Sequence, residues 1–242
     1  MINIVIPMAG RGARFKEAGY SLPKPLIPVN GVMMIEAVVN NLRPNTPHRF
    51  IFICLKEHMD MYKLKSKLTN ISDNCVTVPV TDVTEGAACT VLIAKEYIDN
   101  EDALMIANSD QYVDTDINAY LKAITYDGLI MTMTAYDKKW SFIRYDEKGF
   151  VTEVREKEAV SNEATVGIYN FTKGCDFVKA AEDMINKNIR VNNEFYVAPV
   201  YNELIKAGKR IGFLNIGSIG NGMYGLGTPE DLEAFLRRGT NG

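Results

Sequence analysis

Apolar positions in the first 135 residues form two kinds of segment that alternate along the chain. Short continuous apolar runs predict buried strands at Ile2–Ile6, Phe50–Leu55, Val76–Val80, Leu104–Ala107 and Leu129–Ala135. Between them, apolar residues recur every three or four positions, which predicts helices at Met33–Leu42, Met59–Leu68, Ala87–Tyr97 and Ile117–Ile124. This alternation is typical of βαβ units. We therefore expect a three-layer, Rossmann-like α/β fold, in which a mostly parallel mixed sheet carries helices on both faces.

The pattern changes after about Asp137, where short strands are expected to follow one another. Asp146–Gly149 has the composition of a hairpin turn between the first two of them. A later helix should begin at an N-cap formed by Asn192 and Asn193 and end at Gly208. The expected segments are Phe142–Tyr145, Phe150–Val154, Val166–Phe171, Cys175–Asn186, Glu194–Ala207, Arg210–Ile216 and a closing helix capped by Thr228.

Composition narrows the class of protein. With 242 residues, 47% hydrophobic and 24% charged, the chain is typical of a globular protein that buries a substantial core. Its net charge of −3 gives no general attraction to nucleic acid or to an anionic membrane, so a polyanion site must be local. The four cysteines show no paired spacing, and no apolar run has the length of a membrane span. We expect a cytoplasmic protein with no nucleic-acid or membrane partner. A homo-oligomer is left open, because no apolar stripe identifies an interface.

The strongest candidate for chemistry is the turn after the first strand. Ala9, Gly10 and Gly12 lack side-chain bulk, so backbone N–H groups there are able to approach an anion closely. Arg11 and Arg14 add forked, positively charged donors.

About ten residues later, Lys24 lies between Pro23 and Pro25. The prolines should hold Lys24 on a stiff, extended segment. The turn and the lysine together predict a phosphate grip, and a nucleoside triphosphate is its expected ligand. A second candidate turn, Asn108-Ser109-Asp110-Gln111, follows the strand Leu104–Ala107. Ligands of parallel α/β sheets bind outside the carboxyl ends of the strands, where both turns should lie.

Seven short motifs follow one another along the chain: Ala9-Gly10-x-Gly12-x-Arg14-Phe15, Pro23-Lys24-Pro25, Glu85-Gly86-x-Ala88, Ser109-Asp110, Glu156-Lys157, Gly167-Ile168-Tyr169 and Gly227-Thr228-Pro229-Glu230. In this order they resemble the nucleotidyltransferase superfamily. That superfamily includes the sugar-1-phosphate nucleotidylyltransferases and the phosphocholine-type cytidylyltransferases. The resemblance extends from Ile2 to about Arg237 and depends on the ordered set, since each motif alone is weak.

The resemblance implies the fold of the nucleotide-diphospho-sugar transferases. It implies a single domain over residues 1–242, with a nucleotide-binding half at 1–137 and an acceptor-binding half at 138–242. The implied reaction joins an NTP to a phosphorylated small molecule and releases pyrophosphate. No protein nucleophile or general base is needed, because the acceptor phosphate is already ionised near neutral pH. His48 and His58 are the chain's two histidines, and neither lies beside a candidate nucleophile.

Roles for individual residues also follow from the resemblance. Arg14 would hold the departing pyrophosphate, and Arg11 would reach the same phosphates. Lys24 would neutralise the region of the α-phosphate. Asp110 would bind Mg²⁺, which takes oxygen ligands and often uses one or two carboxylates together with phosphates and waters. The implied catalytic residues are Arg14, Lys24, Asp110 and Lys157.

Further residues are implied on each side of the reaction. The nucleotide side comprises Ala9, Gly10, Arg11, Gly12, Thr81, Glu85, Gly86 and Ser109. The acceptor side comprises Glu156, Lys157, Thr165 and Gly167, with Trp140, Tyr169 and Tyr196 as candidate lining. Each has a plain structural alternative: a solvated turn or strand edge for the charged residues, an ordinary helix start for Gly86, and the core for the aromatic residues.

One position departs from the family pattern. Family members commonly carry a second metal-binding aspartate two residues before the Gly-Thr-Pro segment, and this chain has Gly225 there. Either Asp110 acts with phosphates and water alone, or another residue such as Asn221 substitutes. The departure also favours an unusual acceptor.

Other classes of protein fit the sequence less well. A dinucleotide-binding dehydrogenase would need glycine or alanine where Phe15 stands, and it would give Lys24 no role. A glycosyltransferase would not need Arg14 and Lys24 in this arrangement. Gly225 is the one hint of a regulatory protein that binds nucleotide without turnover. Among transferases, a sugar 1-phosphate is the commonest acceptor, and phosphocholine or a phosphorylated amino acid is the rival. The compact first turn resembles that of the uridylyl- and cytidylyltransferase branches, and this resemblance implies CTP or UTP.

Overall fold

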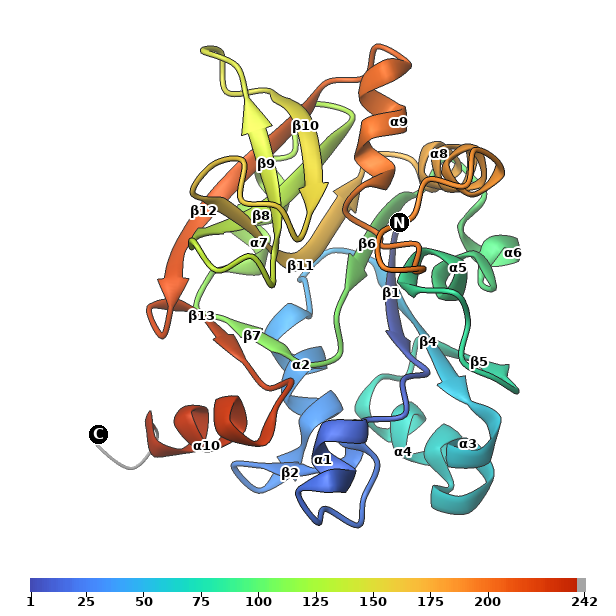
Figure 1. Ribbon diagram of the computed structural model, residues 1–242. Coiled ribbons are helices and arrows are strands. Elements are labelled where there is room, and N and C mark those ends of the chain that lie inside the picture. The colour runs from blue at the N-terminus through green and yellow to red at the C-terminus, as the bar shows by residue number, and fades with distance from the viewer. Residues whose placement is uncertain (239–242) are drawn as a thin grey trace.

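The computed structural model describes residues 1–238 (Figure 1). Its strands are β1 (Ile2–Met8), β2 (Pro28–Val29), β3 (Val32–Met33), β4 (His48–Leu55), β5 (Cys75–Val80), β6 (Ala103–Ala107), β7 (Gln111–Val113), β8 (Gly128–Thr134), β9 (Ser141–Tyr145), β10 (Val151–Glu156), β11 (Glu163–Phe171), β12 (Ile211–Ile219) and β13 (Gly222–Gly225). Its helices are α1 (Ala13–Glu17), α2 (Met34–Leu42), α3 (Lys56–Tyr62), α4 (Leu64–Ile71), α5 (Ala87–Leu92), α6 (Lys95–Ile98), α7 (Ile117–Lys122), α8 (Gly174–Asn186), α9 (Val200–Lys206) and α10 (Pro229–Arg238), with a 3₁₀ turn η1 (Lys24–Leu26).

Strands from both halves of the chain form one large mixed sheet, in which the strand order is β5-β4-β1-β6-β11-β8-β12-β13-β7. The hairpin of β9 and β10 joins it through β11. Neighbours are parallel from β5 to β6, whereas β11 is antiparallel to both β6 and β8. Because two reversals cancel, β8 and the adjoining β12 point the same way as β1. The expected three-layer, mostly parallel α/β fold is therefore confirmed.

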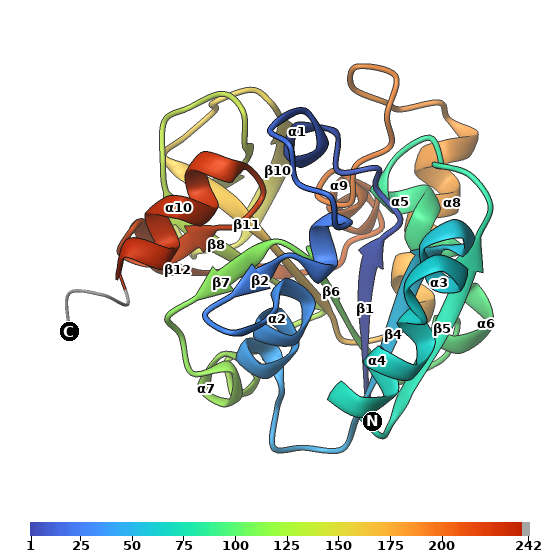
Figure 2. The same ribbon diagram turned by 90° about the horizontal axis from the view of Figure 1, so that it is seen from below.

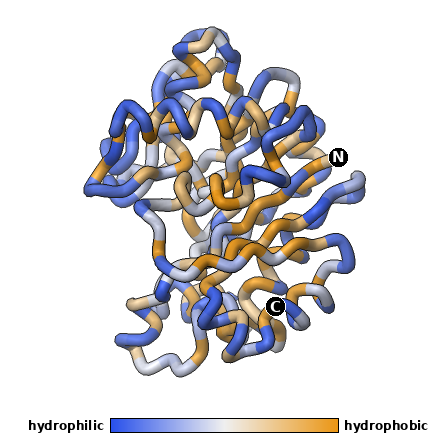
Figure 3. The backbone as a smooth tube through the Cα atoms, turned by 90° about the vertical axis from the view of Figure 1, so that its right-hand side faces the viewer, coloured by the Kyte–Doolittle hydropathy of each residue, from blue (hydrophilic) through white to orange (hydrophobic). Residues whose placement is uncertain are grey.

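Two hydrophobic cores cover the two faces of this sheet, and alternate residues of β1 divide between them. Ile4 and Ile6 pack in the core that is covered by α2, α4, α7 and α10. Val5 packs on the other face, under α5, α8 and α9. All three side chains are fully buried, which explains why this strand reads as a continuous apolar run. The apolar segments follow the strands through the interior, and the polar segments lie at the periphery (Figure 3).

The carboxyl ends of β1, β4, β5 and β6 meet at one edge of the sheet. The helices α1, α3 and α10 lie at this end of the molecule, toward which β1 points (Figure 1). Figure 2 views the molecule from this end. The turns after β1, β5 and β6 therefore converge, although they are far apart in the sequence.

Several expected local features are confirmed. The Asp146–Gly149 turn joins β9 to β10, and the Asp146 carboxylate accepts from the N–H groups of Lys148 and Phe150. Gly208 follows α9 with φ +81°. Thr228 caps α10, because its hydroxyl accepts the N–H of Asp231 at 3.1 Å.

Three expected helices differ from the structure. The predicted helix Met59–Leu68 is two helices, α3 and α4, because Lys63 adopts a left-handed conformation with φ 50° and ψ 42°. The predicted helix Ala87–Tyr97 is likewise divided into α5 and α6. The prediction of a helix from Glu194 was wrong, since α9 begins at Val200. Asn192 and Asn193 have positive φ and form a turn between the bridged residues Val191 and Glu194.

Short elements without a periodic pattern were not expected from the sequence. They are the hairpin β2–β3, the helix α1, and the strands β7 and β13, which pair with each other at the end of the sheet. Among residues 1–238, no helix combines the length and the hydropathy that crossing a membrane requires.

Lys63 offers a test of the helix break. A left-handed conformation costs a non-glycine residue about 1–2 kcal/mol, so we expect Lys63→Gly to raise the free energy of unfolding by about 0.5–1 kcal/mol. Lys67→Gly, on the exposed side of α4, should lower it by about 1 kcal/mol. Urea unfolding of both variants measures the difference, and an equal loss in both would show that Lys63 is not strained.

Candidate functional site

The turn after β1 presents unpaired backbone donors at the carboxyl edge of the sheet. Gly12 has φ +61° and ψ +36° and begins α1. Within residues 1–238, no backbone N–H from Gly10 to Arg14 donates to a protein acceptor. Free N–H groups at a glycine-rich turn form an anion-binding concavity. The turn therefore has the geometry expected of a phosphate grip.

Lys24 packs directly against this turn. A Cβ added to Gly12 would lie 3.4 Å from the Cβ of Lys24, so the glycine permits the close approach. The expectation that Lys24 is extended was wrong, because Lys24 opens the 3₁₀ turn η1 with Pro23 as its N-cap. The N–H groups of Leu26 and Ile27 donate to Pro23 and Lys24 carbonyls, and this hydrogen-bonded turn holds the lysine.

The Lys24 ammonium forms an ion pair with Asp110, with 2.8 Å between Nζ and Oδ2. Both side chains are about one-fifth exposed, at 23% and 22%, so this pair lies at the base of the site. The Asp110 carbonyl accepts the N–H of Leu226 at 2.7 Å. The pair thus joins the turn after β1, the turn after β6 and the segment before α10.

A cavity of about 610 Å³ opens beside Lys24. Arg11, Gly12, Lys16 and Thr81 line it, together with side chains of α3. The lining carries three cations, Arg11, Lys16 and Lys24, and one carboxylate, Glu57, so its net positive charge suits a polyanion.

Arg14 lies outside the lining of this cavity and is exposed. Its positive charge instead interacts with Glu230 at the start of α10. There the pKa of Glu230 is lowered by a hydrogen bond with its own backbone N–H, by a hydrogen bond from Thr228 and by the nearby Arg14 charge. Arg14 therefore lies on the side of the site that Asp110 and α10 share.

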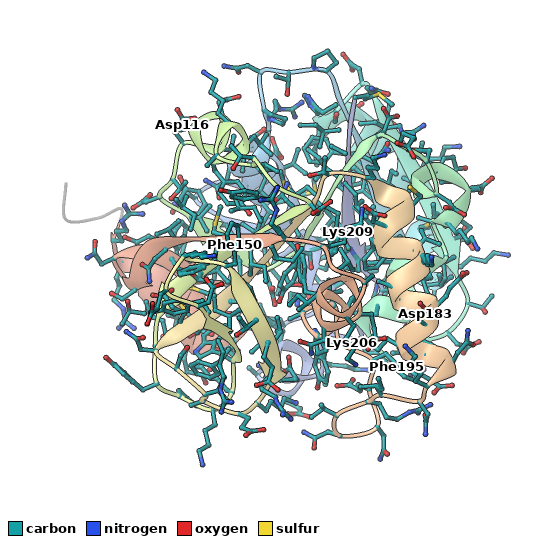
Figure 4. All side chains as sticks on the ribbon, turned by 90° about the horizontal axis from the view of Figure 1, so that it is seen from above. Asp116, Phe150, Asp183, Phe195, Lys206 and Lys209 are labelled. Carbon is teal, nitrogen blue, oxygen red and sulfur yellow. The ribbon has the colours of Figure 1, made fainter. Side chains whose placement is uncertain are left out.

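Gly86 and Glu85 are held by the loop between α8 and α9. Gly86 has φ +130°, and a Cβ there would lie 2.4 Å from the carbonyl oxygen of Phe195. Backbone bonds link Ala88 N–H to the Phe195 carbonyl and Phe195 N–H to the Glu85 carbonyl. The Glu85 carboxylate pairs with Arg190 at 2.8 Å. Phe195 is labelled in Figure 4. Gly86 is thus required by packing, and a nucleotide contact for either residue stays a prediction.

A second cavity, of about 200 Å³, collects most of the residues expected on the acceptor side. Its lining includes Glu156, Thr165 and Gly167, together with Trp140, Tyr169 and Tyr196. The Thr165 hydroxyl is hydrogen-bonded to the Tyr169 hydroxyl at 3.0 Å, and both residues are buried. Ser109, on the expected nucleotide side, is also buried, at 4% exposure.

Two buried polar atoms at this cavity have no hydrogen-bond partner among the described residues: Trp140 Nε1 and Gln111 Oε1. Gln111 is 8% exposed. Its Oε1 would lie 2.1 Å from a Cβ at Gly167, so the glycine, with φ +81°, makes room for it. The sequence placed Gln111 in a candidate ligand-binding turn but assigned it no role. Its place after Ser109 and Asp110 was the available signal.

Lys157 is strained at the rim of this cavity. Its φ is +58°, and its ammonium donates to the Tyr196 hydroxyl at 2.7 Å. Tyr196 donates in turn to Glu194, and its pKa is raised by burial and by this hydrogen bond. Burial also raises the pKa of Glu156, partly opposed by the hydrogen bond from Ser141. A left-handed backbone conformation such as that of Lys157 is strained and persists only where surrounding contacts impose it. Such residues often occur at functional sites.

The residues present fit a hard cation only if a ligand completes its coordination. Among residues 1–238, no group of three His, Cys, Asp or Glu side chains is placed to hold a metal ion. Asp110 offers carboxylate oxygen, and its present partner is the positive charge of Lys24. Such a donor suits Mg²⁺ brought by a polyphosphate. Asn221 lies at the opposite end of β13 from Gly225, on the turn from β12, so it does not replace residue 225.

This edge of the sheet combines free backbone donors with cations, an arrangement expected of an α/β protein that binds phosphorylated ligands. The chain belongs to the nucleotidyl transferase family, whose model matches residues 4–212. That is a family of enzymes, as the names of the relatives below indicate.

Relatives include the bifunctional protein GlmU of Methanococcus aeolicus, 25% identical over 174 residues, and that of Methanocaldococcus jannaschii, 23% identical over 177. The matches cover 70% and 71% of this chain but only 40% of each relative. The chain therefore spans well under half the length of these curated relatives.

Among solved structures, a nucleoside-diphosphate-sugar pyrophosphorylase from Vibrio cholerae is 27% identical with a TM-score of 0.81. The alignment covers 97% of this chain and 99% of that protein. A putative glucose-1-phosphate thymidylyltransferase from Bacillus anthracis shares the fold, with a TM-score of 0.79 at 18% identity, covering 100% and 96%.

The packing of Gly86 gives a prediction that needs no ligand. Gly86→Ala places a Cβ against the Phe195 backbone at a strained φ, so we expect a loss of at least about 2 kcal/mol in the free energy of unfolding. Gly10→Ala is the control, because its added Cβ meets nothing within 4 Å. Denaturant unfolding without nucleotide measures both. Normal stability of Gly86→Ala would favour a ligand contact as the reason for the glycine.

Proposed function

We propose that this protein joins an NTP to a sugar 1-phosphate, giving an NDP-linked product and pyrophosphate. Membership of the nucleotidyl transferase family and the converging phosphate-binding turns support this proposal. The similar protein from Vibrio cholerae is a nucleoside-diphosphate-sugar pyrophosphorylase, which supports the sugar class of acceptor.

The reaction balances without a covalent enzyme intermediate. A phosphate oxygen of the acceptor attacks the α-phosphorus of the NTP and forms a new P–O bond. The bond from that phosphorus to the α–β bridging oxygen breaks, and the electron pair leaves with pyrophosphate. Because both reactants are anions, the protein contributes by neutralising charge and by holding them in line.

Each charged residue has a place in this proposal. The free N–H groups of the turn and the Arg11 side chain bind the phosphates. Lys24 leaves Asp110 and neutralises the α-phosphate, while Arg14 holds the departing pyrophosphate. Lys157 grips the acceptor phosphate, and Glu156 accepts a hydroxyl of the acceptor. Mg²⁺, bound by Asp110 and the NTP, would supply further charge neutralisation.

We infer the chemical class of the acceptor from two polar atoms at the smaller cavity that have no hydrogen-bond partner. Trp140 Nε1 is a donor and Gln111 Oε1 is an acceptor, and both are buried. Leaving such groups unpaired costs about 1–3 kcal/mol each. A ligand hydroxyl both donates and accepts, so a polyhydroxylated acceptor such as a sugar phosphate satisfies both atoms.

Phosphocholine is the rival acceptor, and the aromatic rings of this cavity would be its recognition element. Those rings are already in contact with cations of the chain. The Lys139 ammonium lies 5.2 Å from the Trp140 ring centroid, and the Lys157 ammonium lies 4.9 Å from that of Tyr196. A trimethylammonium group also has no hydrogen-bonding capacity for Trp140 or Gln111. The structure thus favours the sugar.

Pyrophosphate release tests the proposal. CTP, UTP, GTP and dTTP are each combined with glucose 1-phosphate, other sugar 1-phosphates or phosphocholine, in the presence of Mg²⁺. We expect release with a sugar 1-phosphate and with CTP or UTP, as the compact first turn favours. Release with phosphocholine alone would support the rival. No release with any pair, despite nucleotide binding, would indicate a regulatory protein.

Lys24→Ala should lower turnover by about 10²-fold or more, by analogy with the removal of other transition-state donors. Arg14→Ala should have an effect in the same direction. Lys179→Ala, on the exposed side of α8, is the matched control and should keep wild-type turnover. Steady-state pyrophosphate release measures all three, and unchanged kinetics in both site variants would rule out the phosphate grip.

Trp140→Phe retains an aromatic ring but removes the unpartnered N–H. Loss of one hydrogen bond of about 1.4 kcal/mol corresponds to a tenfold change in affinity, so KM for the sugar 1-phosphate should rise about tenfold. KM for the NTP should not change. An unchanged acceptor KM would mean that Trp140 Nε1 does not contact the acceptor.

A further inference from the structure

The carboxylate of Asp231 is unpaired and lies close to the phosphate-binding region. Asp231 belongs to the first turn of α10 and is half-buried. Its backbone N–H donates to Thr228, but among residues 1–238 its carboxylate has no hydrogen-bond donor or cation as a partner. The adjacent Glu230 differs, because it is exposed and its carboxylate is hydrogen-bonded by Thr228.

Two glycines place Asp231 and Asp110 against the same short segment. A Cβ added to Gly225 would lie 3.3 Å from both Cγ and Oδ2 of Asp231. A Cβ added to Gly227 would lie 2.8 Å from Oδ2 of Asp110. Leu226 between them is fully buried in the core. The added Cβ positions therefore show that Gly225 faces the carboxylate of Asp231 and Gly227 faces that of Asp110.

The Asp231 carboxylate thus fills the space in which a side chain of residue 225 would lie. We propose that Asp231 supplies the second carboxylate for the divalent cation that accompanies the NTP, together with Asp110. This inference depends on the proposed function, since the NTP phosphates complete the coordination. Mg²⁺ held by two carboxylates and substrate phosphates is a common arrangement.

The local charges agree with this assignment. Lys24 neutralises Asp110, but no cation of the described residues compensates Asp231. When Lys24 moves to the phosphates, two carboxylates are left at the two glycines. A divalent cation restores neutrality there. An anionic side chain in the first turn of a helix also interacts favourably with the helix dipole, so a purely structural role for Asp231 must be distinguished by experiment.

The test is a titration with Mn²⁺, followed by electron paramagnetic resonance, in the presence of a CTP analogue with a methylene group between the α- and β-phosphorus atoms. We expect Asp231→Asn to weaken Mn²⁺ binding at least about tenfold, as Asp110→Asn should. Glu233→Gln, on the exposed side of the same helix, is the control and should bind Mn²⁺ like the wild type. Thermal melting of each variant verifies that it is folded.

A carboxylate exchange separates the metal role from a structural one. Gly225 has no left-handed φ, so an aspartate is compatible with its backbone. In the double variant Gly225→Asp/Asp231→Ala the carboxylate moves to residue 225, and Mn²⁺ affinity should recover relative to Asp231→Ala. Recovery is not expected if Asp231 only stabilises α10.

Wild-type Mn²⁺ affinity in folded Asp231→Asn and Asp231→Ala would overturn the inference, and so would a wild-type protein that binds no Mn²⁺ with the analogue. Failure of the proposed function is a different result. It is seen as no pyrophosphate release by the wild-type protein with any substrate pair, whatever the Mn²⁺ titration gives.

Discussion

The ion pair of Lys24 and Asp110 connects three parts of the chain that the sheet brings to one edge. Lys24 comes from η1, which packs against the turn after β1, Asp110 comes from the turn after β6, and the Asp110 carbonyl holds the segment before α10. The two charges of the pair cancel, and each side chain is only about one-fifth exposed. The pair therefore keeps a cation and a carboxylate together at the base of the site. In the proposed reaction, incoming phosphates and a divalent cation would offer each partner a stronger counterion. The ion pair would then hold both groups in place for the reactants.

The loop between α8 and α9 links the two sides of the proposed reaction. Its Phe195 backbone is bonded to the segment around Gly86, and its Tyr196 holds the ammonium of Lys157. Val197 and Ala198 of the same loop line the smaller cavity. Gly86 fits under this loop only because it lacks a Cβ. A residue that resembles a base-contact glycine in the sequence thus also determines how the acceptor side is assembled.

Several groups that are costly in a folded protein lie at this site, although others, such as left-handed Lys63 and the unpartnered amide atoms of Asn3 and Asn170, lie elsewhere in the described residues. Lys157 has a left-handed backbone, two buried polar atoms lack partners, and Asp231 has an uncompensated carboxylate. A stable fold satisfies such groups unless a ligand does so. In the proposed reaction, two ligands would satisfy these groups, one rich in phosphate and one rich in hydroxyl groups.

The sequence by itself determined the α/β class, because runs such as Ile2–Ile6 are buried on both sheet faces and their periodicity is a local property. It also identified the glycines and arginines of the first turn, whose chemistry depends on neighbours in the chain. The helix break at Lys63, the short strands β7 and β13, and the start of α9 lack any periodic signal and were settled by packing. Only the tertiary structure decided which side chains meet. Lys24 and Asp110 are 86 residues apart, and Asp231 reaches Gly225 because α10 folds back over β13. Such contacts depend on the order of strands in the sheet, and hydrophobic periodicity carries no information about that order.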